Sequence, residues 1–242
     1  MIEIDAVEIS NPVPDETFRR SFRIVGLERR KVIERFRFRE DAQRSLIAEL
    51  LTRAVIARRL GRFISGIVLV REDGRKPRLS QAEGFDFNIS HSGRWVVCAS
   101  GFAPVGADVE RIGNLAWDDA KDALSAEEQD RVRPSPDAEW NAAYTFLWTI
   151  KESYLKALGE GLSIPPSELT VAPAADGEIR LFRNGTLVED AFFRAYAPDA
   201  EHRLAVCAFF APPPEAFTIR TMRDVLSVVD KDDLDETQHE KG

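Results

Sequence analysis

The chain has 242 residues, a formal net charge of −8 and 44% hydrophobic residues, enough for one large or two small domains with real cores. No apolar run approaches the roughly eighteen residues of a membrane span, and the acidic, alternating N-terminus is typical of a strand and not of a signal peptide. The acidic balance and the lack of a recognisable binding motif argue against nucleic acid as a partner.

The two cysteines, Cys98 and Cys207, lie in the apolar strand-like runs VVCAS and AVCAF. Such positions are typical of buried free thiols, and they argue against a disulfide or a cysteine metal site. We therefore expect a protein of the reducing cytoplasm.

Charge is spread unevenly along the chain. Residues 19–44 hold ten arginines and lysines against four acids, whereas residues 230–242 hold six acids and two lysines. A basic segment on an acidic protein indicates an acidic partner or phosphates, or else a solvated helix face, and both readings stay open.

In chain order, apolar residues at helical spacing predict a helix over 41–60, which Gly61 ends. Residues 64–70 follow as an expected buried strand, and GRKP at 74–77 as a turn. Alternation over 85–90 predicts a strand with one apolar face, residues 95–99 are its hairpin partner, and a strand is expected over 105–112.

In the second half, Ser125 and Glu128 have the spacing of a capping box that begins a helix, and a longer helix is expected over 138–158, ending at Gly159. Short strands are expected near 169–171, 179–182, 187–188, 192–196 and 204–210, with a hairpin turn at Asn184-Gly185. After residue 220 the chain turns polar, and from about 230 we expect a flexible acidic tail.

GADVE at 106–110 places two carboxylates on one strand face. Residues i and i+2 of a strand point the same way, roughly 6.5–7 Å apart, so Asp108 and Glu110 face together while Val109 points into the core. The pair repels itself unless a cation lies beside it. An exposed strand face is the alternative.

The predicted helix over 138–158 carries three further candidates. Glu152 lies at the edge of the apolar arc and Lys156 one turn later on the same side, a spacing that also occurs in ordinary surface pairs. Lys151 falls inside the apolar arc, where a lysine must either extend its ammonium to water or meet an anion.

FNISHSG at 87–93 is the third segment of interest. Burial of the apolar strand face leaves Asn88 and Ser90 on the other side, with His91 at the turn. A turn histidine is often only solvated, but small donors surround this one and Gly93 lets backbone approach a ligand. Oxygen ligands suit Mg²⁺ and lysines suit phosphates, so the three segments together indicate metal-assisted chemistry on a phosphate-rich substrate.

The order GRKP, FNISHSG, GADVE and W-x-x-K-E-x-x-x-K-x-x-G-x-G-L resembles the Sfp-type 4′-phosphopantetheinyl transferases of the holo-[acyl-carrier-protein] synthase superfamily, over about residues 1–220. The resemblance implies an α/β (α+β) fold of two similar halves with pseudo-twofold symmetry, each an antiparallel sheet packed with helices. The similar runs RWVVCAS and RLAVCAF agree with such a repeat. We expect halves at 1–105 and 106–220 and a polar tail at 221–242.

The same resemblance implies roles for single residues. Asp108, Glu110 and Glu152 would be the metal ligands, and Glu152, Lys156 and His91 the catalytic residues. Coenzyme A would contact residues that begin with Arg44 at the 3′-phosphate region, with Arg29 as a further basic position: the full set is Arg44, Lys76, Pro77, Ser90, His91, Lys151 and Lys156.

The implied activity is transfer of 4′-phosphopantetheine from coenzyme A, the co-substrate, to a serine of an apo-acyl or peptidyl carrier protein, with Mg²⁺ or substituting Mn²⁺. A monomer with no membrane partner is expected. Two alternatives remain: a non-catalytic module that binds coenzyme A or a carrier, and a metal-dependent nucleotide pyrophosphohydrolase that uses water as acceptor.

Overall fold

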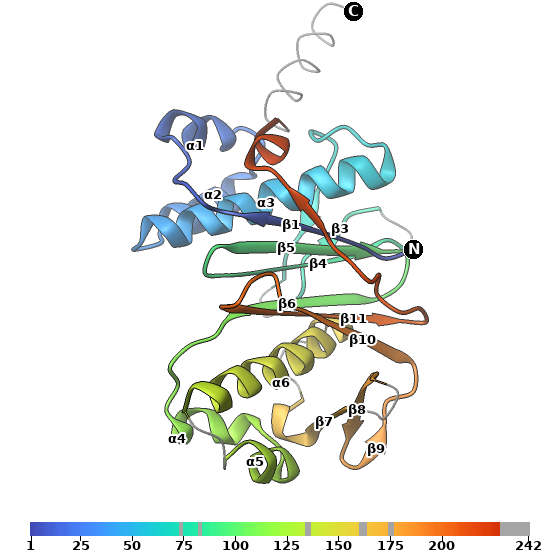
Figure 1. Cartoon of the computed structure of the whole chain (residues 1–242). Coiled ribbons are helices and arrows are strands. Elements are labelled where there is room, and N and C mark those ends of the chain that lie inside the picture. Colours follow the sequence, from blue (N-terminus) through green and yellow to red (C-terminus); the bar gives the residue numbers. More distant parts are fainter. Residues whose placement is uncertain (73–74, 82–83, 134–136, 160–163, 174–176, 228–242) are drawn as a thin grey trace, which may run out of the picture.

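The computed structural model describes residues 1–72, 75–81, 84–133, 137–159, 164–173 and 177–227. Its layers run helix, sheet, sheet, helix from the top to the bottom of Figure 1. The expected acidic tail from about 230 lies outside the described residues. Within them, no helix is long and apolar enough to cross a membrane.

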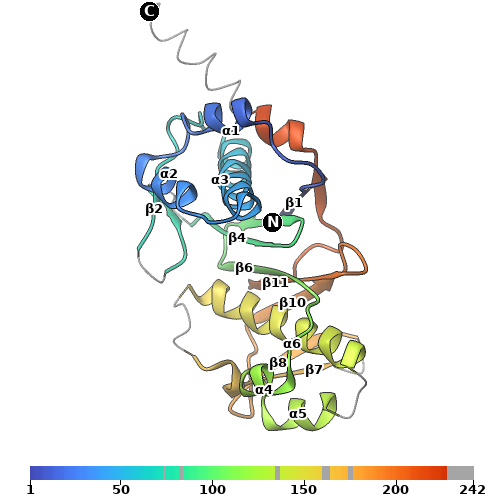
Figure 2. The same ribbon diagram turned by 90° about the vertical axis from the view of Figure 1, so that its left-hand side faces the viewer.

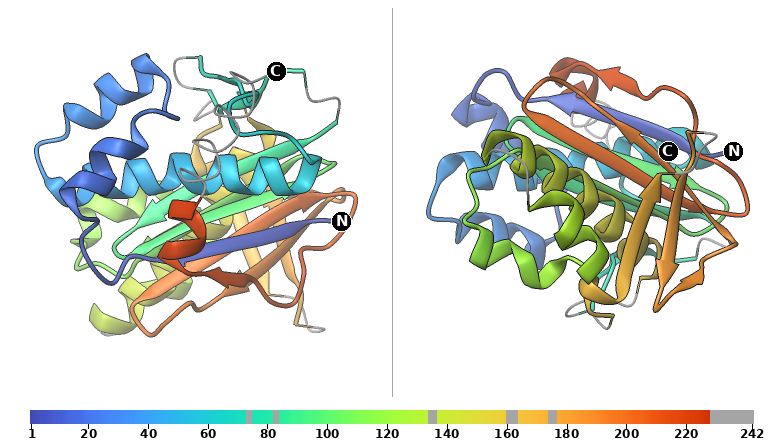
Figure 3. Two further views of the ribbon diagram at one scale, coloured as in Figure 1. Left: turned by 90° about the horizontal axis from the view of Figure 1, so that it is seen from above. Right: turned by 60° about the horizontal axis from the view of Figure 1, so that its bottom comes forward.

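The first half contains the four-stranded sheet β12-β1-β5-β4 and the long helix α3, which lies across it (Figures 1 and 3). Its elements are β1 Glu3–Glu8, α1 Asp15–Ser21, α2 Leu27–Glu34, α3 Arg39–Leu60, β2 Leu69–Val70, β3 Arg78–Leu79, β4 Asp86–Ser92 and β5 Trp95–Gly101.

The second half contains the three-stranded sheet β10-β11-β6 with helix α6 against its outer face, and the small sheet β7-β8-β9 beside that helix (Figures 2 and 3). Its elements are β6 Val105–Arg111, α4 Trp117–Ala120, the 3₁₀ turn η1 Lys121–Ala123, α5 Ala126–Val132, α6 Asp137–Leu158, the 3₁₀ turn η2 Pro166–Glu168, β7 Leu169–Pro173, β8 Ile179–Arg183, β9 Thr186–Leu187, β10 Ala191–Tyr196 and β11 His202–Phe209. The chain then returns to the first half, where β12 Thr218–Arg220 joins the sheet beside β1.

The repeat expected from the two similar runs is confirmed by the connectivity. Each half runs strand, long helix, strand, strand, and in each sheet the last of these strands lies in the middle, as β1-β5-β4 and as β6-β11-β10. All of these neighbours are antiparallel. The runs RWVVCAS and RLAVCAF form the equivalent central strands β5 and β11.

Alternation along the central strands explains the layered core. Val96 and Cys98 of β5 pack with the helices of the first half, and Ala205 and Cys207 of β11 pack with α6 and the small sheet. The residues between them point the other way and form a core shared by the two sheets, which includes Ile4, Ala6, Val97, Ala99, Val105, Ala107, Val109, Leu204 and Val206. Both cysteines are free and buried, as the sequence predicted.

Helix boundaries follow the predicted signals. Gly61 ends α3 with φ +61°, and Ser125 and Glu128 form the complete capping box of α5. Asn184 and Gly185 take φ +49° and +79°, the left-handed pair of a type I′ hairpin.

The segment 64–70 does not form the expected buried strand. Only Leu69–Val70 is a strand, and Val68 and Val70 are exposed. Ile64 and Ile67 do pack into the core of the first half, so this apolar segment forms a buried turn and not a hydrogen-bonded strand. Near the other end of the chain, β12 pairs in parallel with β1, and residues 222–227 are helical with Val225 buried in the same core.

Candidate active site

The site lies where strands β4 and β6, one from each half, run side by side. Every second residue of β4 turns its side chain to the backbone of β6, because side chains on a strand alternate. These side chains accept hydrogen bonds from N–H groups of β6: Asp86 from Val105 (2.8 Å), Asn88 from Ala107 (2.9 Å), Ser90 from Val109 (3.2 Å) and Ser92 from Arg111 (3.0 Å). We call these four pairs the seam. It joins the halves and brings Ser90 and Ser92 to the carboxylates of β6.

Asp108 lies at the centre of the site and is only 1% exposed. Its Oδ1 accepts a hydrogen bond from the Ser90 hydroxyl at 3.0 Å and contacts the ammonium of Lys156 at 2.5 Å. Its Oδ2 is buried and has no hydrogen-bond partner among the described residues. A buried carboxylate oxygen without a partner is costly, so this atom is suited to an ion.

Glu110 and Glu152 add two carboxyl groups beside Asp108. The Ser92 hydroxyl donates to Glu110 at 2.8 Å, and burial, followed by the charge of Asp108, raises the pKa of Glu110 to about 7. Burial also raises the pKa of Glu152, where the charges of Lys156 and Asp108 oppose one another. Negative charge therefore accumulates here beyond what one ammonium neutralises.

This donor set fits a hard divalent cation, because it offers carboxylate oxygens, one of which has no partner within the described part of the chain. In the described part of the chain, no three side chains of the His, Cys, Asp and Glu types are already grouped as a complete metal centre. Lys156 takes the place of a cation at Asp108 instead. A divalent cation held by all three carboxylates would therefore require rotation of their side chains.

Gly106, the first residue of GADVE, lets α6 lie directly on β6. A Cβ atom at Gly106 would stand 2.0 Å from the Ser153 carbonyl oxygen and 2.4 Å from the Ala157 nitrogen of α6. No side chain fits there. The close approach places Glu152 and Lys156, on the same helix, next to the carboxylates of β6.

Positively charged side chains also act on His91 of β4. His91 lies within β4 between Ser90 and Ser92, and not at the turn where the sequence placed it. Its pKa is lowered by partial burial first and then by the charges of Arg44, Arg29 and Lys156. The charges of three cationic side chains therefore act on this imidazole. Such an arrangement is suited to phosphate groups.

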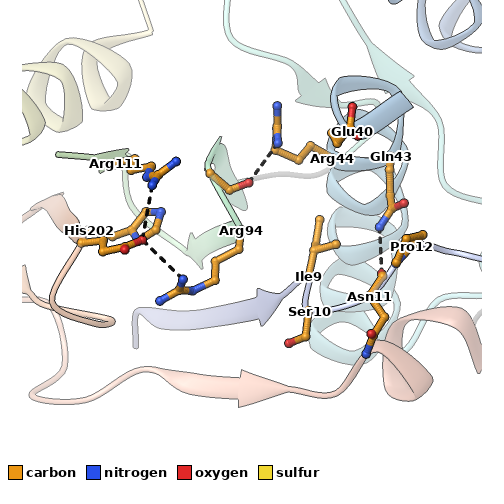
Figure 4. A pocket seen from close by; sticks show the side chains of 12 residues that line it. Ile9, Ser10, Asn11, Pro12, Glu40, Gln43, Arg44, Arg94, Arg111 and His202 are labelled. Carbon is orange, nitrogen blue, oxygen red and sulfur yellow. Dashed lines mark hydrogen bonds and ion pairs between the residues drawn. The ribbon is translucent and has the colours of Figure 1, made fainter. Parts of the chain in front are cut away.

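Arg44, at the start of α3, reaches the β4–β5 turn. Its guanidinium donates to the Gly93 carbonyl at 3.0 Å and pairs with Asp41. Gly93 takes φ +55°, and a Cβ there would collide with the buried ring of His202. Arg44 also lines a cavity of about 380 Å³ on the outer side of the turn (Figure 4).

Lys76 closes the far end of the seam. Its ammonium donates to Asp86 at 2.5 Å and to the Val105 carbonyl at 2.6 Å, and burial lowers its pKa. A cavity of about 250 Å³ lies beside it, between the seam and the end of α6. Pro77 follows Lys76 and is half-buried, and the first residue of the GRKP turn lies outside the described residues.

Lys151 is not part of this site, which corrects the role that the resemblance implied. It is fully buried and forms a 2.5 Å ion pair with Glu128 on the opposite side of α6, with further hydrogen bonds to the carbonyls of Ala123 and Pro166. The sequence predicted that a lysine in the apolar arc meets an anion. That anion is a structural carboxylate and not a substrate phosphate.

Two residues with clear roles were not singled out as site residues from the sequence. Asp86 and Asn88 hold β6 at the seam, and their alternation with Phe87 and Ile89 was the available signal. The sequence does not show that β4 and β6 are neighbours, so it could not predict that these side chains accept hydrogen bonds from the backbone of β6.

Comparison with known proteins agrees with this geometry. The model for the N-terminal part of 4′-phosphopantetheinyl transferases matches residues 11–103, and the model of the 4′-phosphopantetheinyl transferase superfamily matches residues 104–207. A 4′-phosphopantetheinyl transferase of Bacillus subtilis is 34% identical over 227 residues, which cover 93% of this chain and 100% of the relative. The transferase Sfp of Bacillus subtilis strain 168 is 30% identical (93% and 100% covered), and psf-1 of Bacillus pumilus is 34% identical (93% and 98% covered). The chain therefore belongs to the Sfp-type 4′-phosphopantetheinyl transferases.

Proposed function

We infer that the protein transfers 4′-phosphopantetheine from coenzyme A to a serine of an apo-carrier protein and releases adenosine 3′,5′-bisphosphate. The observation that carries this conclusion is the buried Asp108, which has one oxygen without a partner among the described residues, pairs with Lys156 and interacts electrostatically with Glu110 and Glu152. Family membership supplies the reaction class, and this cluster is the part of the chain equipped for it.

The carboxylates of Asp108, Glu110 and Glu152 would hold Mg²⁺, which supplies charge neutralisation at the pyrophosphate when bound. Ser90 and Ser92 fix two of these carboxylates through their hydroxyls. The seam thereby keeps these two carboxylates near one another before substrate arrives, and rotation of the side chains would complete the ion site.

In the reaction, the serine hydroxyl oxygen of the carrier forms a bond to the phosphorus that bears pantetheine. The bond from this phosphorus to the bridging oxygen breaks, and the adenosine bisphosphate leaves with that electron pair. Glu152, directly or through a water, accepts the serine proton. Lys156 and His91 stabilise the charge on the phosphate oxygens, and Arg44, Lys76 and Pro77 face the nucleotide end.

Substitution of the carboxylates tests this assignment. Asp108→Asn and Glu152→Gln should each reduce transfer by at least a hundredfold, because each removes a charged group from the reacting centre. Transfer is measured by mass spectrometry of the carrier, and circular dichroism checks that the variants are folded. Transfer at wild-type rates by Glu152→Gln would refute both its proton-accepting and its metal-binding role.

A further inference from the structure

The β4–β5 turn, residues 92–95, is held by a carboxylate from the loop between β10 and β11. Asp199 of this loop accepts hydrogen bonds from two residues of the turn, from Trp95 Nε1 at 2.7 Å and from the Arg94 guanidinium at 2.8 Å. The turn belongs to the first half of the chain, and Asp199 belongs to the second. One carboxylate therefore ties the tip of the β4–β5 hairpin to the opposite half.

His202 connects the same carboxylate to Gly93 of the turn. Its Nδ1 donates to Asp199 at 2.8 Å, and the residue is only 1% exposed. The Nε2 side of the ring lies against Gly93, where a Cβ atom would stand 2.3 Å from Nε2, and Nε2 has no hydrogen-bond partner among the described residues. The ring therefore acts on the turn by packing, and its bond to Asp199 fixes its orientation.

Asp199 is held in its charged form, although only 19% of its side chain is exposed. Burial acts to raise the pKa of Asp199, but hydrogen bonds from Trp95, from His202 and from the N–H of Glu201 outweigh it and lower the pKa below its usual range. Hydrogen bonds to an ionised acceptor are shorter and stronger than those between neutral groups. The contacts that hold the turn are therefore charge-assisted.

The turn leads directly to one carboxylate of the site. Ser92, its first residue, donates to Glu110 at 2.8 Å and accepts from the Arg111 N–H at 3.0 Å. A shift of the turn would misalign these hydrogen bonds, which weaken steeply as their geometry departs from the ideal. A carboxylate that accepts one hydrogen bond keeps further lone pairs for an ion. The position that Glu110 offers to a cation therefore depends on where the turn lies.

We propose that Asp199 and His202 are positioning residues: they hold the β4–β5 turn so that Ser92 keeps Glu110 in place for the divalent cation. The proposal rests on the proposed function, which assigns Glu110 to that cation. The alternative is that the pair only stabilises the junction between the halves. The two roles differ in a measurable way, because a purely stabilising contact changes Tm, whereas positioning changes the affinity of the folded protein for the cation.

Calorimetric titration of Mg²⁺ into the full-length protein saturated with coenzyme A, without carrier and well below Tm, tests the proposal. Asp199→Asn keeps the size of the side chain but removes its charge and one of its two acceptor oxygens. It should weaken Mg²⁺ binding by about three- to tenfold, as expected when one hydrogen bond to a ligand is lost. Asp118→Asn is the matched control, because it removes the same charge from an exposed pair with Lys121 in the same half, and it should leave the affinity unchanged.

A double-mutant cycle with Ser92→Ala shows whether the effect passes through Ser92. Ser92→Ala should itself weaken Mg²⁺ binding, and adding Asp199→Asn should then cause no further loss. The inference is overturned if the two losses multiply, if Ser92→Ala has no effect, or if Asp199→Asn lowers Tm but binds Mg²⁺ like wild type.

If Asp199→Asn does not fold, the same cycle with His202→Phe decides by the same criteria, because this variant loses the bond to Asp199 but keeps a ring beside Gly93. Each of these failures leaves the proposed function intact. Wild type that binds no coenzyme A, or binds it without taking up Mg²⁺, would instead refute the proposed function.

Discussion

Substitution of Lys151, which forms a buried ion pair with Glu128, tests whether this lysine stabilises the fold or takes part in catalysis. Lys151→Met leaves the Glu128 carboxylate buried without its cation, although the N–H groups of Ser125 and Val171 still donate to it at 2.9 and 2.8 Å. Breaking a buried ion pair by removing one partner costs about 3–5 kcal/mol. For a chain of this size each kcal/mol lowers Tm by about 2–4 °C, so a loss of roughly 6–20 °C is expected in differential scanning calorimetry.

Transfer by Lys151→Met, measured well below its Tm, should stay within about twofold of wild type. The double variant Lys151→Met, Glu128→Gln should regain part of the stability, because the uncompensated charge is gone. Lys121→Met is the control: its pair with Asp118 is exposed, and such pairs contribute about 0–1 kcal/mol. If Lys151→Met has a normal Tm but a tenfold lower kcat, the structural role is refuted and Lys151 instead contacts a substrate phosphate.

Three further predictions concern the packing at Gly106, the titration of His91 and the basic segment 19–44. Gly106→Ala should lower Tm and transfer together, because its Cβ collides with the backbone of α6, whereas Gly113→Ala, with open space around it, should change neither. Coenzyme A should bind with proton uptake at pH values below the ordinary histidine pKa of about 6.5, since a bound phosphate raises the lowered pKa of His91. Calorimetry in buffers of different ionisation enthalpy should show the uptake in wild type, and its persistence in His91→Gln would exclude this residue as the source. If the basic segment attracts an acidic carrier, replacing Arg19, Arg20 and Arg23 by Glu should raise KM for that carrier at low ionic strength. It should also flatten the dependence of KM on salt, because exposed charges are screened beyond about 8 Å at physiological salt. An unchanged KM would favour docking through apolar contacts.

Periodicity predicted the elements that carry the site. The alternation around Phe87 and Val109 located both strands of the seam, and helical spacing located α6 with Glu152 at the edge of its buried face. These signals are local, since one buried face decides which way every second residue points. The sequence shows that Gly106 is a glycine but not why one is required there. The reason is a tertiary contact, because the backbone of α6 lies directly against it.

Partners that are distant in sequence could not be predicted. Lys151 pairs with Glu128, which lies 23 positions earlier in the chain and also completes the capping box of α5. The sequence spacing of the capping box revealed the contact of Glu128 with Ser125 but not its pair with Lys151. Asp199 likewise bonds to Arg94 and Trp95 from the other half of the chain. The strand expected over 64–70 was wrong because a short apolar run does not distinguish a ladder from a buried turn.

The most direct test of the central claim gives the protein coenzyme A, Mg²⁺ and a panel of apo-carriers, and follows both the carrier mass and the fate of coenzyme A. The account predicts phosphopantetheine on the carrier serine, adenosine 3′,5′-bisphosphate in equal amount, inhibition by EDTA and no consumption of coenzyme A without carrier. Cleavage of coenzyme A in the absence of carrier would show a pyrophosphohydrolase, and binding of coenzyme A without any turnover across the panel would show a non-catalytic module; either result would contradict the account.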